Sequence, residues 1–115
     1  MFEELRNWAQ LSQVWFVHDY VQLQFHDEHT INVYYPFTVT VKDKSYKQGE
    51  FGYADSLVKI IGSRIKNISY KQNSHFNLEF NCGTLFSINL VSNISSLPEA
   101  FELNLKNGQH IEVIA

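Results

Sequence analysis

Residues 20–35, YVQLQFHDEHTINVYY, and residues 75–90, HFNLEFNCGTLFSINL, decide the fold, because the second stretch repeats the first without a gap at an offset of 55. Each stretch alternates apolar and polar residues, breaks at a polar turn and alternates again, which is typical of two half-buried strands joined in a hairpin. The apolar positions match in the pairs Val21 with Phe76, Leu23 with Leu78, Phe25 with Phe80, Ile31 with Phe86, and Val33 with Ile88. We interpret the match as an internal duplication; the alternative is that any two amphipathic hairpins align this well.

The match continues upstream of both hairpins. Leu11, Val14 and Phe16 correspond to Ile65, Ile68 and Tyr70 at an offset of 54. Because each unit has only one apolar face, we expect the two units to cover one another. The sequence therefore predicts a β-dominated α+β fold, in which two pseudo-symmetric antiparallel β-meander repeats pack as a sandwich or a partly open barrel.

Helices are predicted at two places outside the repeats. Phe2, Leu5 and Trp8 recur at helical spacing, which predicts an N-terminal helix over about 2–11. A central helix is predicted over about 54–61, with Asp55 or Ser56 as its cap and Gly62 as its left-handed stop. The preceding residues 42–52 show no periodicity and are predicted to be a long loop.

The chain is expected to form a single domain over residues 1–115. Repeat one covers about 11–41, the loop and helix 42–62, repeat two about 64–91, and a C-terminal hairpin 101–114. The Asn107-Gly108 pair in that hairpin favours a type I′ turn, since both residue types accept positive φ angles.

Composition narrows the class of protein. Hydrophobic residues make up 44% of the 115 residues, which is enough for a core without disulfides or metals. The single cysteine, together with an acidic N-terminus and no apolar run of membrane-spanning length, leads us to expect a cytoplasmic protein with no membrane contact. The net charge of −3 argues against a nucleic-acid partner.

No catalytic motif can be recognised, and we expect no enzymatic activity, no cofactor and no metal. His26 and His29 flank a tight turn, without the spacing of a zinc site. One alternative stays open: a small ligand- or metal-binding domain that uses a cleft beside the 42–52 loop with His18, His26 and His29. A second alternative is a structural module that associates with itself, for example as a homodimer joined through unpaired edge strands.

The segments SLVKIIGSRIKNISY, FNLEFNCGTLFSINL and PEAFELNLKNGQHIEVI carry a resemblance to a known group of proteins. Over roughly residues 11–114 the chain resembles small, largely uncharacterised bacterial proteins with a duplicated β-hairpin unit, which look like the immunity components of polymorphic toxin or contact-dependent inhibition systems. The resemblance implies a protein that binds a cognate toxin protein domain and neutralises it by occluding its active site. It supplies no catalytic residues.

Partner-binding candidates are the acidic and aromatic residues expected on loops and hairpin tips, because acidic surface steers encounters with basic toxins and tyrosines anchor interfaces. The acidic candidates are Asp19, Asp27, Glu28, Glu79, Glu99 and Glu102, and the aromatic candidates are Tyr34, Tyr46 and Tyr53.

Overall fold

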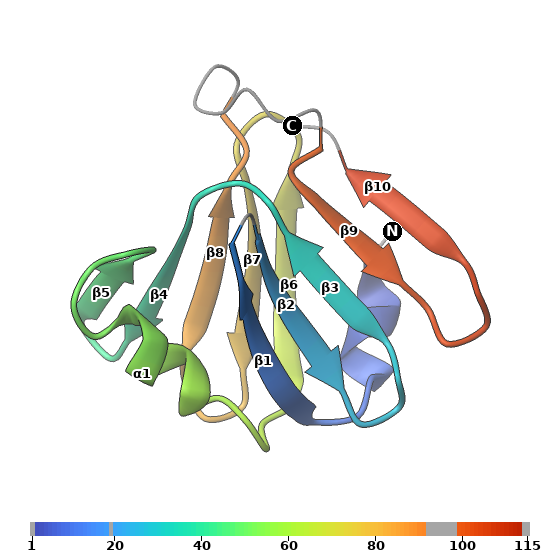
Figure 1. Cartoon of the computed structure of the whole chain (residues 1–115), viewed down its shortest axis with the longest axis horizontal. Helices are drawn as coiled ribbons and strands as arrows, with labels where there is room; N and C mark the ends of the chain where they lie inside the picture. The colour runs from blue at the N-terminus through green and yellow to red at the C-terminus, as the bar shows by residue number, and fades with distance from the viewer. Residues whose placement is uncertain (1, 19, 92–98, 114–115) are drawn as a thin grey trace.

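The computed structural model describes residues 2–18, 20–91 and 99–113, whose strands form two antiparallel sheets of five strands each (Figure 1). The first sheet has the order β1 (Leu11–Val17), β2 (Tyr20–Phe25), β3 (Thr30–Val33), β9 (Phe101–Asn104) and β10 (His110–Val113). The second has the order β5 (Lys44–Lys47), β4 (Phe37–Val41), β8 (Leu85–Asn89), β7 (His75–Phe80) and β6 (Ile65–Lys71). The predicted β-dominated fold with two antiparallel sheets is confirmed.

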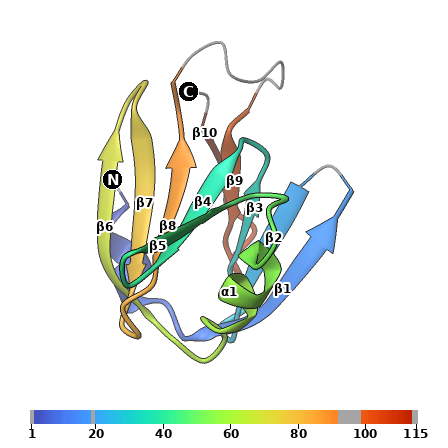
Figure 2. The same ribbon diagram turned by 90° about the vertical axis from the view of Figure 1, so that its left-hand side faces the viewer.

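The core lies between the two sheets, which form the two layers seen in Figure 2. Every apolar position matched in the two repeated stretches is at most 2% exposed. Phe76 of the second sheet stacks on Phe101 of the first, with ring centroids 4.3 Å apart and an interplanar angle of 24°. Burying one such side chain contributes roughly 1.5–3 kcal/mol, so the period-two alternation is what holds the layers together.

The chain crosses between the layers twice. After β3 it enters the second sheet, where β4 pairs with β8, and after β8 it returns to the first sheet, where β9 pairs with β3. Each three-stranded meander is therefore completed by a hairpin from the other half of the chain. β4 leaves the meander of β1 to β3 and pairs with β8, and the C-terminal hairpin of β9 and β10 takes the equivalent place beside β3.

The strand registers of the two halves match. Both first strands have the same irregularity, between Leu11 and Gln13 in β1 and between Ile65 and Asn67 in β6. The hairpin tips match as well, since the amide of Phe25 donates to His29 O and the amide of Phe80 donates to Thr84 O, both at 2.9 Å. At the third position of the tip the residues Glu28 and Gly83 both have positive φ angles, of 72° and 94°.

The helices are shorter than predicted. The N-terminal helix is a 3-10 helix, η1 (Glu3–Asn7), because the backbone is already extended at Trp8 and β1 begins at Leu11. The central helix, α1 (Tyr53–Val58), has Gly52 as its N-cap, so the prediction of an Asp55 or Ser56 cap was wrong. The helix ends at Val58 with Lys59 as its C-cap, so the predicted stop at Gly62 was wrong, although Gly62 does have a left-handed φ of 94°.

Two turns also differ from expectation. The predicted long loop over 42–52 contains β5, a polar edge strand that lacks alternation because three of its four residues are exposed. At the C-terminal hairpin Gly108 has a φ of 92° but Asn107 does not have a positive φ. The amide of Gly108 donates to Leu105 O at 2.9 Å, which gives an ordinary turn followed by a left-handed glycine in place of the predicted type I′ turn.

Candidate functional site on the outer face of the first sheet

Glu102 is the centre of a hydrogen-bonded cluster on the outer face of the first sheet. Its Oε1 accepts hydrogen bonds from Asn32 Nδ2 at 2.6 Å, from Tyr34 Oη at 2.9 Å and from Asn104 Nδ2 at 3.5 Å. Nε2 of His110 lies 3.3 Å from the other carboxylate oxygen. The side chain of Glu102 is only 13% exposed, so these partners replace most of its hydration.

The register of the strands produces this cluster. Asn32 of β3 lies directly opposite Glu102 of β9, and Gln22 of β2 lies opposite Asn32 on the other side. Gln22 Nε2 donates to Asn32 Oδ1 at 2.8 Å, which orients the amide so that Nδ2 faces the carboxylate. A polar ladder therefore runs across β2, β3 and β9, and His110 continues it on β10.

The protonation states of Glu102 and Tyr34 follow from their contacts. Burial alone would raise the pKa of Glu102, but the hydrogen bonds from Asn32, Tyr34 and Asn104 and the charge of His110 outweigh it and lower that pKa below its usual value. Burial, the hydrogen bond to Glu102 and its negative charge raise the pKa of Tyr34 to about 12. The pair is therefore a phenol donating to a carboxylate at any physiological pH, and a carboxylate so fully occupied favours recognition over proton transfer.

Two further groups adjoin this pair. The ring of Tyr20, at the start of β2, lies 5.4 Å from the ring of Tyr34, centroid to centroid. Val17 of β1 is opposite Tyr20 in the strand register. The negative charge of Glu99 also contributes to the raised pKa of Tyr34, so Glu99 belongs to the same region. We call Tyr20, Tyr34, Glu99 and Glu102 the Glu102 face.

The outer face of the second sheet serves as an internal comparison, since its registers match. Where the first sheet has Trp15, Val17, Tyr20, Tyr34 and Glu102, the second has Ser69, Lys71, His75, Asn89 and Thr38 at the corresponding positions. Core positions are apolar in both sheets, yet Trp and Tyr rings and an enclosed acid occur on one outer face alone among these pairs. Packing does not require this difference, because the second sheet folds with polar and basic residues there.

Three of the nine predicted partner-binding residues, Tyr34, Glu99 and Glu102, thus lie together. Asp19 lies outside the described residues. The sequence reasoning missed Tyr20, Asn32 and His110. Tyr20 could have been found, because it is an aromatic residue at an outward position of an alternating strand.

The other five predicted residues do not join this face. Asp27 Oδ2 accepts a hydrogen bond from the Ala9 amide at 2.8 Å and so ties the N-terminal segment to the β2–β3 tip, where Glu28 is exposed. Tyr53 packs its ring against Phe16 and Phe37, which gives it a core function. Tyr46 lies against Gly52, and Glu79 on the second sheet accepts from Asn67 Nδ2 at 2.6 Å.

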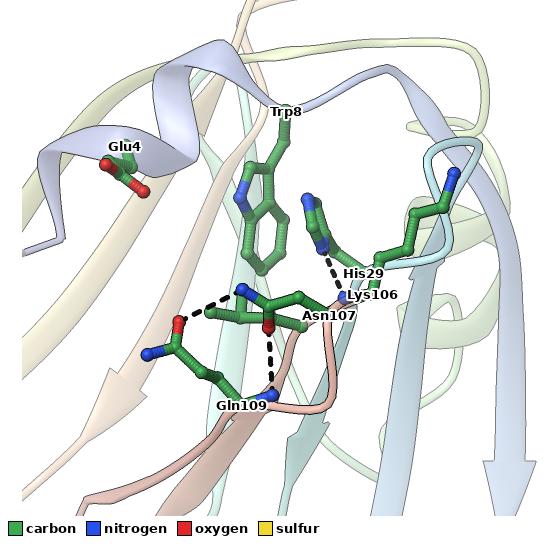
Figure 3. Close-up of a pocket in the computed structure, with 7 residues that line it drawn as sticks. Glu4, Trp8, His29, Lys106, Asn107 and Gln109 are labelled. Atoms are coloured by element: carbon green, nitrogen blue, oxygen red, sulfur yellow. Dashed lines mark hydrogen bonds between the residues drawn. The ribbon is translucent and has the colours of Figure 1, made fainter.

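A pocket of about 510 Å³ lies between η1, the β2–β3 tip and the β9–β10 turn (Figure 3). Several of its polar groups bond to the chain itself, since the Lys106 amide donates to His29 Nδ1 at 3.0 Å and Asn107 Nδ2 donates to Gln109 Oε1 at 3.3 Å. Trp8 is only 5% exposed and the ring of His29 lies 4.5 Å from it, so no open aromatic face is offered to a ligand. The pocket is therefore the space left where three elements of the fold meet.

Neither of two pockets combines the 42–52 loop with a histidine. A second pocket of about 480 Å³ is lined by Lys47 and Gln48 of that segment and contains no histidine, whereas His29 lines the pocket at η1. Within residues 2–18, 20–91 and 99–113 no three His, Cys, Asp or Glu side chains converge as metal ligands would.

Comparison with protein families, with curated proteins and with solved structures finds no match to this chain. Among the helices that the structure describes, none has the length and apolar character needed to cross a membrane. The contrast between the two outer faces is therefore the basis for a functional proposal.

Proposed function

We propose that the protein is an immunity-type binding protein, which neutralises a cognate bacterial toxin domain by covering its active site, and that the Glu102 face makes the contact. The observation that carries the proposal is the pair of Tyr20 and Tyr34 on this face, at positions where the matching sheet has His75 and Asn89. Glu102 holds Tyr34, and the ring of Tyr34 lies against that of Tyr20. Its one cysteine, Cys82, forms no disulfide, which suits action in the cytoplasm.

Preorganisation supports a binding role for the two tyrosines. Interfaces gain affinity when their anchoring side chains are fixed before the partner arrives, because less rotamer entropy is then lost on binding. The hydrogen bond from Tyr34 to Glu102 fixes one ring, and the contact between the two rings restricts the other. Tyrosine is also among the residues that most often dominate interface energies.

Charge supports a basic partner. Glu99 and Glu102 bring two acidic groups to one face, and Glu102 stays ionised because its pKa is lowered. The chain as a whole carries a net charge of −3. A basic toxin domain would be attracted to this face and would associate faster at low ionic strength.

The proposal is tested with the proteins encoded by the reading frames next to this gene. Each is expressed in bacteria alone, with this chain, and with its Tyr20→Ala variant. We expect one neighbour to arrest growth, this chain to restore growth, and Tyr20→Ala to restore it poorly. The control is Ser87→Ala, which removes a side chain from the outer face of the second sheet and should restore growth fully.

Binding is then measured by calorimetry with the purified toxic neighbour. Removing a tyrosine anchor is expected to cost about 1–3 kcal/mol, a loss of roughly tenfold to a hundredfold in affinity. If no neighbour is toxic, or if Ser87→Ala weakens binding as much as Tyr20→Ala does, the proposal is rejected.

We also infer that the two halves arose by duplication, with β1 to β5 and β6 to β10 as the units. The shared irregularity in β1 and β6 supports this, because alternation alone does not require a bulge at the same place. The matched hairpin tips support the duplication as well. So does the fact that each half of the chain adds one hairpin to the meander of the other half. The recognition face is then a feature that one copy has and the other lacks.

A further inference from the structure

The open edge of β1 is the most apolar edge among the described strands. Four strands lie at the ends of the two sheets: β1, β10, β5 and β6. Each of the other three carries ionisable residues, Lys66 and Lys71 on β6, Lys44 and Lys47 on β5, and His110 and Glu112 on β10. β1, with the sequence LSQVWFV, carries none. Charges on edge strands are a common protection against pairing with another chain, so β1 is the unprotected edge.

Exposed apolar side chains accompany this edge. Trp15, Phe16 and Val17 are consecutive, and they are 52%, 45% and 40% exposed. Because consecutive residues point to opposite faces of a strand, apolar surface is exposed on both sides of the edge. At the matching positions of β6 the chain has Ser69, Tyr70 and Lys71, so two of the three are polar there.

The backbone groups that face the open edge can be assigned from the register. The amide of Phe25 donates toward β3, so alternation directs the backbone groups of Gln22 and Gln24 toward β1. Val14 and Phe16 lie opposite Leu23 and Val21, whose backbone groups point away from β1. The N–H and C=O groups of Val14 and Phe16 therefore face the open edge. Those of Leu11 are already bonded to Ser63 O and to the Gly62 amide, both at 2.8 Å, which limits the open stretch to about 13–17.

We propose that β1 pairs with β1 of a second copy of this chain, antiparallel and centred on Trp15. In this register Val14 exchanges two backbone hydrogen bonds with Phe16 of the second copy, and the two-fold axis repeats the exchange. Trp15 then lies opposite Trp15 of the second copy. A copy of the chain is the fitting occupant because an uncharged strand meets an identical one without opposing like charges.

The dimer would join two first sheets into one continuous sheet of ten strands, because each first sheet contributes five. A two-fold axis perpendicular to that sheet places both Glu102 faces on the same side. The aromatic surface left exposed at β1 is modest, well below the roughly 1,200 Å² total of a standard interface, so we expect dissociation at micromolar concentrations.

Sedimentation velocity over a series of concentrations tests the association. We expect the wild-type chain to change from monomer to dimer with increasing concentration. Val17→Lys, which gives β1 the residue that β6 has, should raise the dissociation constant about tenfold or more. The matched control is Phe51→Ser, since Phe51 is fully exposed but lies outside β1, and the dimer should be retained. A wild-type chain that stays monomeric throughout, or a dimer lost equally with Phe51→Ser, would overturn the proposal.

Cross-linking tests the register and can accumulate a covalent dimer even from weak association. In a Cys82→Ser background, Trp15→Cys places one cysteine opposite its copy in a non-hydrogen-bonded pair, where Cα atoms are about 4.5 Å apart and a disulfide can form. Ser69→Cys is the matched control on β6. We expect a covalent dimer with Trp15→Cys and none with Ser69→Cys. Equal yields, or no dimer with Trp15→Cys, would contradict the register. Tyr20→Ala should still dimerise, so failure of this proposal is distinguishable from failure of the proposed toxin contact.

Discussion

The phenol of Tyr34 donates a hydrogen bond of 2.9 Å to the carboxylate of Glu102, although 68 residues separate them in the chain. The two are brought together because β9 crosses back from the second sheet to pair with β3. The bond therefore links the second half of the chain to the first, on the outer face of the first sheet. Its two ionisable groups make it accessible to titration.

Stability is expected to fall at alkaline pH in a way that depends on Tyr34. Its pKa is raised from 10.0 to about 12 in the folded protein, so the bound proton stabilises the fold fully below pH 10. That contribution is lost as the pH rises from 10 through 12. Urea unfolding at several pH values should show a shallower loss over this window for Tyr34→Phe. An identical pH dependence in the variant and the wild type would contradict the assignment.

Stability is also expected to fall at acid pH through Glu102. Its pKa is lowered on folding, so its contribution is present above the unfolded value of about 4.3 and is lost as the pH falls through the lower folded pKa. Glu102→Gln should remove this part of the acid sensitivity. At neutral pH Glu102→Ala should cost about 1–3 kcal/mol, because Asn32 and Tyr34 then lose their acceptor. Thr38→Ala, at the matching position of the second sheet, is the control and should cost less.

The layered β fold could be predicted from the sequence because period-two alternation reports directly which side of a strand is buried. The buried apolar residues of β2, β3, β7 and β8 are the predicted ones. It could not be predicted that each half of the chain places a hairpin in the other half's sheet, since β4 and β9 have the same alternation whichever sheet they join. β5 was missed for a related reason, because an exposed edge strand such as KSYK has no apolar side to alternate.

The candidate site could be predicted only in part. Tyr34 and Glu102 were candidates as single exposed groups, but their contact depends on the pairing of β3 with β9, which no local pattern contains. Asp27 and Tyr53 were selected on the same grounds and proved to hold the fold. Residue type and outward position therefore identify the side chains that could recognise a partner, and the register decides which of them meet.

The matched hairpin tips predict opposite effects of exchanging their residues. Glu28 has a φ of 72° at the position where the other tip has Gly83 with a φ of 94°. A side chain in this conformation costs roughly 1–2 kcal/mol, partly offset by the greater freedom of glycine in the unfolded chain. Glu28→Gly should thus stabilise the fold by up to about 1 kcal/mol, since its ion pair with Lys106, at 3.9 Å, is exposed and contributes little.

Gly83→Ala should destabilise the fold by about 1 kcal/mol, and through the backbone alone, because nothing lies within 4 Å of an added Cβ. Chemical denaturation of both variants measures the two effects. The same sign of change for both exchanges would show that the tips do not share a conformation in solution.

The stacked pair of Phe76 and Phe101 predicts coupling between the two sheets. The rings are 4.3 Å apart and come from opposite layers. Phe76→Leu and Phe101→Leu should each cost about 1–2 kcal/mol by unfolding in urea, as both sites are fully buried. Because either change already removes the ring contact, the double variant should cost less than the sum of the two, by about 0.5–1.5 kcal/mol. Phe51→Leu, at a fully exposed position, should change stability by less than about 0.5 kcal/mol. Strict additivity of the core variants would mean that the two layers are held together by burial alone, without a specific contribution from this stack.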